Sequence, residues 1–387
     1  MIYIPFVSPT GQDMFVYEGL GQLCAAGKDY WNPYRPQGFT QYVSLAFRMG
    51  LPPEAIIYMN LLMVALSVWL AGLAWNVLLP PLKSRSRLFS ACKYAFIAAA
   101  HLVFMLGCAR EVLADVPAAC MALAAVWLFI IACGRNNAWL LALSGLALGE
   151  SVTLRLFYCY PAYFLAFAAV LCCLWLKRLA PSAVVGFLLL MAYPILTQYA
   201  FIYQRLHTWT MVDEKATAFE MQEEAGCFMD NGLGPAYGVD VYRDTSLYLY
   251  RCNGCMPDGN GWSGSLQHHD FLEIAKLAWM RNDFYFGSWI PQPAIMYLSD
   301  RVFSFWIYMA NWLAVLSTLS LFILMRRRWI LGGALFFVFG VWGLSLYIHP
   351  ESRYMVLVQA FAWTLAPLAP LAWRGRLWSM DGEAGHA

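Results

Sequence analysis

Repeated apolar runs of near-spanning length constrain this chain more than any other feature of its sequence. A helix that crosses a bilayer needs roughly 20 mainly apolar residues. Runs of this kind occur at residues 55–79, 94–109, 116–133, 138–154, 157–176, 182–203, 302–325, 329–348 and 354–373. Only 12% of the residues are charged, against about 25% in soluble domains. We therefore predict an all-α polytopic membrane protein with about nine transmembrane helices.

The basic residues follow a sided pattern along this map. If the nine segments alternate in direction, one set of short loops holds many more lysines and arginines than the other. These are Lys83, Arg85, Arg87, Lys93, Arg135, Lys177, Arg178, Arg326, Arg327, Arg328, Arg374 and Arg376. The opposite short turns carry Arg110, Arg155 and Arg353. Loops rich in Lys and Arg face the cytoplasm, so the second set of turns is predicted to face the exterior.

The acidic residues favour the exterior side. Of the 23 Asp and Glu residues, Asp381 and Glu383 are the two that map to the cytoplasmic side. We predict five parts: an outer first loop with an amphipathic helix at about 14–26, a first group of transmembrane helices, an outer loop domain, C-terminal transmembrane helices and a cytoplasmic tail. Their bounds are 1–53, 54–204, 205–297, 298–373 and 374–387. Because the predicted outer first loop has no membrane helix ahead of it, we also predict an apolar segment upstream of Met1.

Asp13 is the first candidate for chemistry. It closes a polar turn ahead of the predicted helix at 14–26, and Asp is favoured at helix N-caps. The alternative interpretation makes Asp13 a general base at the outer membrane surface, where it would accept a proton from a hydroxyl.

The short turn between the second and third apolar segments carries Glu111 and Asp115. Residues four apart share one face of a helix. Asp115, two residues before Pro117, also matches a helix start. Glu111 has no such explanation, and acidic groups beside hydrocarbon are functional candidates. At the outer end of the fourth segment, Glu150 and Arg155 are predicted to pair with each other.

The last outer turn is tight and polar, with Glu351 and Arg353 between two apolar segments. A guanidinium matches the geometry of a phosphate and stays charged. The alternative for Arg353 is an interfacial arginine whose charged end reaches water.

The long outer segment offers weaker signals. Cys227, Cys252 and Cys255 lie on the side where thiols can oxidise, so a disulfide among them stays open. His268 and His269 form a weak metal motif, because adjacent histidines rarely point at one ion. Phosphate-loop, G-x-S-x-G and H-E-x-x-H motifs do not occur in the sequence. A net charge of +2 gives no electrostatic footprint for nucleic acid.

Taken in order, several motifs resemble those of the membrane-embedded GT-C glycosyltransferases. The similar groups are the protein O-mannosyltransferases of glycosyltransferase family 39 and the bacterial lipid A aminoarabinose transferases. The motifs are Asp13, Gly27, Arg35-Pro36-Gln37-Gly38-Phe39-Thr40, Glu111, Gly145 with Gly149, Thr153-Leu154-Arg155 and Glu351-Ser352-Arg353-Tyr354. Gln37 and Thr40 stand where the family's element has proline.

The resemblance implies a GT-C-like helical bundle and inverting transfer of a sugar from a polyprenyl-phosphate donor. The acceptor would be the hydroxyl of a glycolipid, a polysaccharide or a protein. Asp13 is the implied base. The lipid phosphate would be bound by Arg353, with Arg155, Arg110 or Lys28. The implied location is a bacterial inner membrane, with the site facing the periplasm.

The remaining acidic residues have less definite roles in this scheme. Glu111 is expected either to take part in catalysis by orienting the acceptor or to hold a divalent metal ion. Asp115 and Glu351 are expected to orient the acceptor or the same ion. No other cofactor is implied.

Three other functions compete with this one. A cytoplasm-facing transferase for nucleotide sugars would need carboxylates for its metal, and that face has almost none. A transporter or flippase would place charges at the bilayer midplane and often show internal repeats. A catalytically inactive GT-C-like scaffold stays open on sequence alone.

Overall fold

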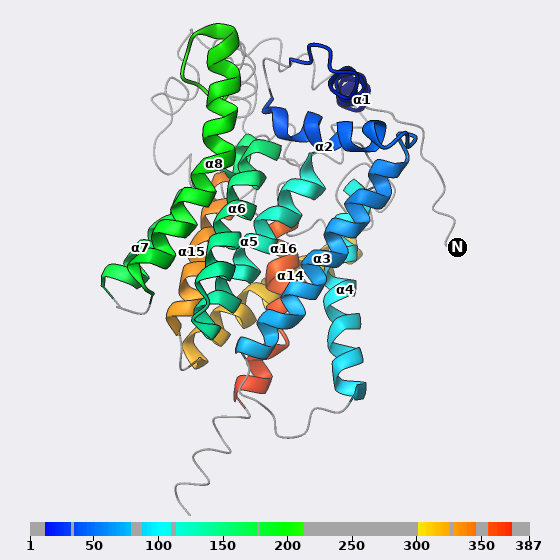
Figure 1. The fold of residues 1–387 in the computed structure, drawn as a ribbon. Helices are drawn as coiled ribbons and strands as arrows, with labels where there is room; N and C mark the ends of the chain where they lie inside the picture. The colour runs from blue at the N-terminus through cyan, green and yellow to red at the C-terminus, as the bar shows by residue number, and fades with distance from the viewer. Residues whose placement is uncertain are drawn as a thin grey trace, which may run out of the picture.

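The computed structural model describes residues 12–31, 35–78, 87–109, 114–175, 179–212, 301–325, 328–345 and 355–373. Within these ranges every regular element is helical. Most of the helices run side by side as a bundle, while α1 (Gln12–Ala25) and α2 (Gln37–Arg48) lie across one end of it (Figure 1).

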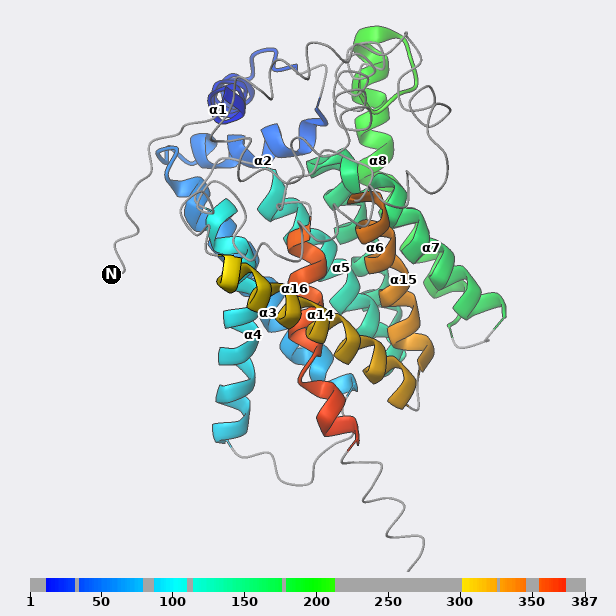
Figure 2. The ribbon, with the colours of Figure 1, turned by 180° about the vertical axis from the view of Figure 1, so that it is seen from behind.

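The bundle helices coincide with the nine predicted apolar segments. They are α3 (Ala55–Leu78), α4 (Arg87–Ala109), α5 (Asp115–Arg135), α6 (Ala138–Leu154), α7 (Cys159–Leu174), α8 (Pro181–Leu206), α14 (Arg301–Leu324), α15 (Arg328–Ser345) and α16 (Val356–Leu365). A short 3₁₀ turn, η1 (Leu156–Tyr158), joins α6 to α7. Seen from behind, α14 runs diagonally across α16 (Figure 2).

Five helical stretches are long and apolar enough to cross a membrane. They are Ala55–Leu78, Asp115–Arg135, Leu156–Leu174, Pro181–Leu206 and Val356–Trp373. The prediction of a helical membrane protein is confirmed in this form, while a crossing by all nine segments stays a prediction.

Several of the exposed aromatic side chains lie near the two ends of the bundle. Trp139, Trp175 and Trp373 stand at helix ends away from α1 and α2, and Tyr58 and Tyr160 at helix ends close to them (Figure 1). Trp and Tyr are enriched at the two membrane–water interfaces. Their placement fits a bundle whose apolar middle faces lipid.

The start of α4 differs from the prediction, since the helix begins at Arg87 rather than near residue 94. Lys93, expected in a loop, lies inside the helix and is buried. Its ammonium donates hydrogen bonds to Gly72 O at 3.1 Å and to Asn76 Oδ1 at 3.2 Å. The helix therefore extends past its apolar run because α3 supplies acceptors for the charge.

The described residues of the predicted first loop, 1–53, form two helices, of which one was predicted. α1 starts at Gln12, so Asp13 lies inside its first turn instead of in front of it. The amphipathic helix is α2, which the sequence analysis treated only as a motif. Its buried residues share one face: Gln37, Phe39, Thr40, Val43, Ser44 and Ala46.

Both helices of this loop end at a glycine with positive φ, Gly27 at 66° and Gly50 at 69°. The amide after each glycine bonds back to the helix, Lys28 N to Leu23 O and Leu51 N to Ala46 O. This arrangement satisfies carbonyls that a helix end leaves open. Gly27, part of the motif series above, is explained by this turn.

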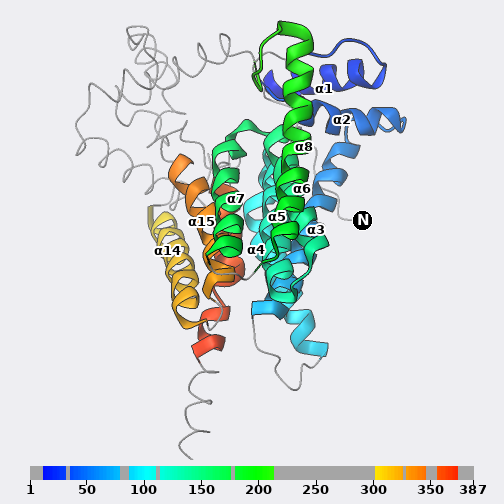
Figure 3. The same ribbon diagram turned by 60° about the vertical axis from the view of Figure 1, so that its left-hand side comes forward.

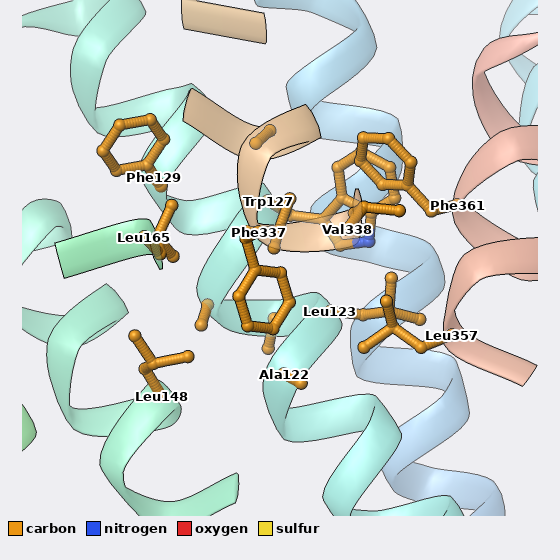
Figure 4. Close-up of a cluster of buried hydrophobic side chains, with 14 of the residues drawn as sticks. Ala122, Leu123, Trp127, Phe129, Leu148, Leu165, Phe337, Val338, Leu357 and Phe361 are labelled. Carbon is orange, nitrogen blue, oxygen red and sulfur yellow. The ribbon is translucent and has the colours of Figure 1, made fainter. Parts of the chain in front are cut away.

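The centre of the bundle is α5, whose residues are almost all buried. Trp127 of α5 stacks on Phe361 of α16, with ring centroids 5.1 Å apart and planes 19° apart. Figure 4 shows these rings beside Leu123, Phe337 and Leu357. Helices in lipid associate mainly through packing of this kind, because lipid gives no hydrophobic drive between them.

The backbones of α6 and α8 approach each other closely, and the two helices lie side by side (Figure 3). A Cβ atom at Gly145 would overlap the carbonyl oxygen of Phe187, and one at Gly149 that of Met191. Residues four apart share a helix face, and small residues at this spacing let two backbones touch. These two glycines therefore act in helix packing.

We expect Gly145→Ala to destabilise the protein by about 1–3 kcal/mol, the usual cost of overpacking, because the added methyl meets backbone that no rotamer change can move. The matched control is Gly186→Ala on α8, where a Cβ would lie 3.7 Å from the Ala142 Cβ, an ordinary contact. Thermal unfolding in detergent checks both variants. Equal melting temperatures for the two would contradict the close approach.

Candidate functional site

The end of the bundle that carries α1 and α2 is the candidate site. The start of α5, the end of α6 and the C-terminal part of α8 reach this end (Figure 1). α2 packs on α6 and on α3. Polar side chains from all of these helices meet here.

An ion pair between Arg155 and Asp115 joins two of the helix ends. Arg155 follows α6 in an extended conformation, and its Nη1 donates to Asp115 Oδ1. The side chains are 17% and 4% exposed, respectively. Asp115 is the first residue of α5, where the helix dipole also favours a negative charge. The guanidinium is thereby held at a fixed place.

This pairing corrects two expectations. Arg155 was predicted to pair with Glu150, but the structure gives it Asp115 as partner. The Thr153 hydroxyl instead donates to Glu150, with its oxygen 3.0 Å from the Glu150 main-chain carbonyl oxygen and 3.3 Å from Glu150 Oε2. Asp115 was expected to cap α5, but the N-cap is Ala114, without a side-chain bond. The sequence shows spacing along the chain, whereas this ion pair forms between helices.

The first turn of α2 rests on the last turn of α6. A Cβ at Gly38 would lie 2.6 Å from the carbonyl carbon and oxygen of Thr153. Thr153 continues the face of Gly145 and Gly149 at the same spacing of four. One small-residue face of α6 thus packs first on α8 and then on α2.

A second contact fixes the start of α2 to α8. The Gln37 amide N–H donates to Gln198 Oε1 at 3.0 Å, and Gln198 Nε2 donates to Met211 O at 2.6 Å. The Gln198 side chain therefore uses its oxygen and its nitrogen to join α2, α8 and the segment after α8.

The Gln37 side chain is different. It is 2% exposed, and among the described residues neither its Oε1 nor its Nε2 has a hydrogen-bond partner. Gln37 was noted only as a departure from the proline of the motif, and neither this amide nor Gln198 was predicted as a site residue. The available signal was the helical spacing of Gln37, Thr40 and Ser44, which places polar groups on the buried face of α2.

Aromatic contacts hold α2 between α1 and α3. Tyr17 of α1 meets Phe39 edge-on, with ring centroids 4.6 Å apart. The Tyr42 hydroxyl donates to Asn60 Oδ1 of α3 at 3.0 Å. Burial raises the pKa of Tyr42 well above its ordinary value of 10.0, so this phenol stays a neutral donor.

The turn after α1 is tied to the end of α8. Asp29 pairs with Arg205 at 2.6 Å, and the guanidinium lies 3.7 Å from the Phe201 ring centroid. The hydrogen bond and charge of Arg205 lower the pKa of the exposed Asp29 carboxyl below 3.8. A carboxyl group whose pKa is lowered on folding stabilises the protein at pH values above its ordinary pKa, and this stabilisation is lost as the pH falls through the lowered pKa. The pair is therefore intact at neutral pH.

The remaining predicted site residues are placed only in part. Lys28 is exposed in the turn beside Asp29. Asp13 is described by its backbone alone, in the first turn of α1. Three candidates lie outside the described residues: Glu111, Glu351 and Arg353. The other residues that the sequence suggested and that lie outside the described ranges are Arg110, Cys227, Cys252, Cys255, His268 and His269. In the described part of the chain, no group of three or more His, Cys, Asp or Glu residues could hold a metal ion.

We expect Arg155→Leu to destabilise the protein by about 3 kcal/mol, because it removes the cation that is bonded to the buried Asp115 carboxylate. Asp115→Leu should also destabilise, and the double variant should be less affected than the sum of the singles. Chemical denaturation of all four proteins measures this coupling. Asp29→Asn, in an exposed pair, is the control and should change little. Strictly additive effects would contradict an ion pair that holds α5 to α6.

No family model, curated protein or solved structure matches this chain. The residues and contacts at this end of the bundle are therefore the basis of the function proposed below.

Proposed function

We propose that the chain is an integral membrane glycosyltransferase that transfers a sugar from a polyprenyl-phosphate donor to an acceptor hydroxyl. In this proposal all nine apolar helices cross the bilayer. The end with α1 and α2 faces the periplasm of a bacterial inner membrane. The observation that supports the proposal best is the part-buried Asp115–Arg155 pair at the same end of the bundle as α1, the helix that carries Asp13.

The ion pair suits a phosphate site. An arginine has five N–H donors, so one guanidinium can hold a carboxylate and a phosphate at the same time. Arg155 is 17% exposed, whereas Asp115 is nearly inaccessible. In the proposal Asp115 positions the guanidinium, which replaces its expected role in orienting the acceptor or a metal.

The proposed reaction is a single displacement. The Asp13 carboxylate takes the proton of the acceptor hydroxyl while that oxygen attacks the anomeric carbon of the donor sugar. The bond from the anomeric carbon to the phosphate oxygen breaks, and the lipid phosphate leaves with the electron pair. Arg155 and Arg353 stabilise its charge, and such electrostatic stabilisation is usually the largest catalytic term. The sugar is transferred with inversion.

The other candidates keep secondary roles in the proposal. Glu111 and Glu351 orient the acceptor or hold a divalent ion. Lys28 adds positive charge near the site. The acceptor is a glycolipid, a polysaccharide or a protein.

Transport is the alternative that a specific observation favours, since α4 carries buried polar groups inside the bundle. His101 Nδ1 lies 2.9 Å from Ile97 O, and its Nε2 lies 3.1 Å from the Ser67 hydroxyl. The carbonyl makes Nδ1 the protonated nitrogen, so Nε2 accepts from Ser67. Lys93 is likewise hydrogen-bonded to α3. Groups satisfied in this way stabilise a helix pair in lipid, and we therefore place transport second.

We expect Asp13→Asn to abolish transfer, because an amide cannot take the proton. Glu18→Gln, on the same helix, is the control and should retain it. A strain deleted for the gene would be complemented with each version, and mass spectrometry would compare the envelope glycolipids and glycoproteins. Wild-type products in the Asp13→Asn strain would rule out Asp13 as the base. No difference between the deleted and complemented strains would count against transfer itself.

We expect an alkaline phosphatase fused within residues 205–297 to be active and a fluorescent protein fused at residue 387 to be fluorescent in the cell. The basic loops predict this orientation, since they stay in the cytoplasm. An inactive phosphatase at the first position would place the proposed site in the cytoplasm and contradict the use of a periplasmic lipid-linked donor.

A further inference from the structure

We infer that the Gln37 side chain recognises a hydroxyl group of the donor sugar. This inference rests on the proposed function and adds a residue that distinguishes the sugar from the lipid phosphate. It starts from the buried amide at the beginning of α2, whose oxygen and nitrogen have no partner among the described residues.

The backbone on both sides of the Gln37 side chain is held in place by contacts with α6 and α8. Its backbone N–H is bound by Gln198, and the next residue, Gly38, rests on the Thr153 carbonyl. α2 is 12 residues long, and its N-cap, Pro36, makes no side-chain hydrogen bond to the first turn. The start of a helix attracts oxygen atoms through its open N–H groups and its dipole. The amide is therefore held in place beside a helix N-terminus.

An amide in this position calls for a ligand of defined chemistry. Gln carries two donors on Nε2 and an acceptor on Oε1, and a buried polar group without partners costs stability. A hydroxyl can donate to Oε1 and accept from Nε2 at once. A phosphate can only accept and would oppose the Oε1 dipole, and a prenyl chain can do neither. The chemistry thus selects a sugar hydroxyl among the parts of the donor.

The position of Gln37 fits this choice. Thr153, which Gly38 touches, is two residues before Arg155, the proposed phosphate ligand. In a polyprenyl-phosphate sugar, one oxygen atom separates the phosphorus from the anomeric carbon. A residue that binds the sugar must therefore lie close to the phosphate site.

The test compares two ligands on the full-length protein in nanodiscs. One is a short-chain prenyl phosphate, and the other is a panel of the same lipid carrying single hexoses or pentoses. For the wild type we expect at least one sugar-bearing lipid to bind about tenfold more tightly than the bare phosphate, an increment that two hydrogen bonds can supply. Gln37→Leu should bind the bare phosphate as the wild type does and lose the tenfold preference.

Stability separates recognition from a structural role. Gln37→Leu removes an amide without partners, so its melting temperature should equal or exceed that of the wild type. Gln198→Leu, the control, breaks two hydrogen bonds and should lower the melting temperature. If the branched leucine of the Gln37→Leu variant prevents folding, the test is repeated with Gln37→Met, because the methionine side chain is similar in length to that of glutamine.

The outcomes distinguish the inference from the proposed function. If the Gln37 variants keep the sugar preference, the amide holds only a buried water and the inference is wrong, while the proposed function stands. Wild-type binding of the bare phosphate without any sugar preference overturns the inference as well. If the wild type binds neither ligand, the proposed function fails and the inference fails with it.

Discussion

The close packing of α6 against its neighbours is the constraint on which the rest of the structure depends. Gly145 and Gly149 allow the α6 backbone to touch α8, and Thr153 on the same face receives Gly38 of α2. Each contact involves backbone atoms, so its geometry cannot relax through a change of rotamer. The positions of α8 and α2 relative to α6 are therefore set by the absence of side chains at three glycines.

The candidate site follows from this packing. With α2 fixed on α6 and joined to α8 through Gln198, the end of the bundle becomes a layer of short polar contacts over an apolar interior. The Asp115–Arg155 pair closes the same end between α5 and α6. An ion pair near hydrocarbon is costly to break, so a charge presented here has little freedom to move.

The sequence predicted the helices well and their contacts poorly. Long apolar runs are typical of helices that face lipid or an apolar core, so nine helical segments could be located from the pattern of the sequence alone. α2 escaped prediction because it is too short and too polar to resemble a span. The partner of Arg155 could not be found either, because Glu150 and Asp115 are both acidic and only the packing of α5 on α6 decides between them. Gln37 could be placed on a helix face, but its lack of a partner is a property of the folded protein.

The stacking of Trp127 on Phe361 has a consequence for biogenesis. The central helix α5 enters the membrane early in synthesis, whereas α16 is among the last helices to be made. The hydrogen bond that the Trp75 indole donates to the Thr364 carbonyl also requires α16. Before α16 is made, the Trp127 ring lacks the ring on which it stacks in the finished fold. The packing of α5 on α3 and α6, which are made before α16, can form first, and the aromatic contact between α5 and α16 completes the centre of the bundle later.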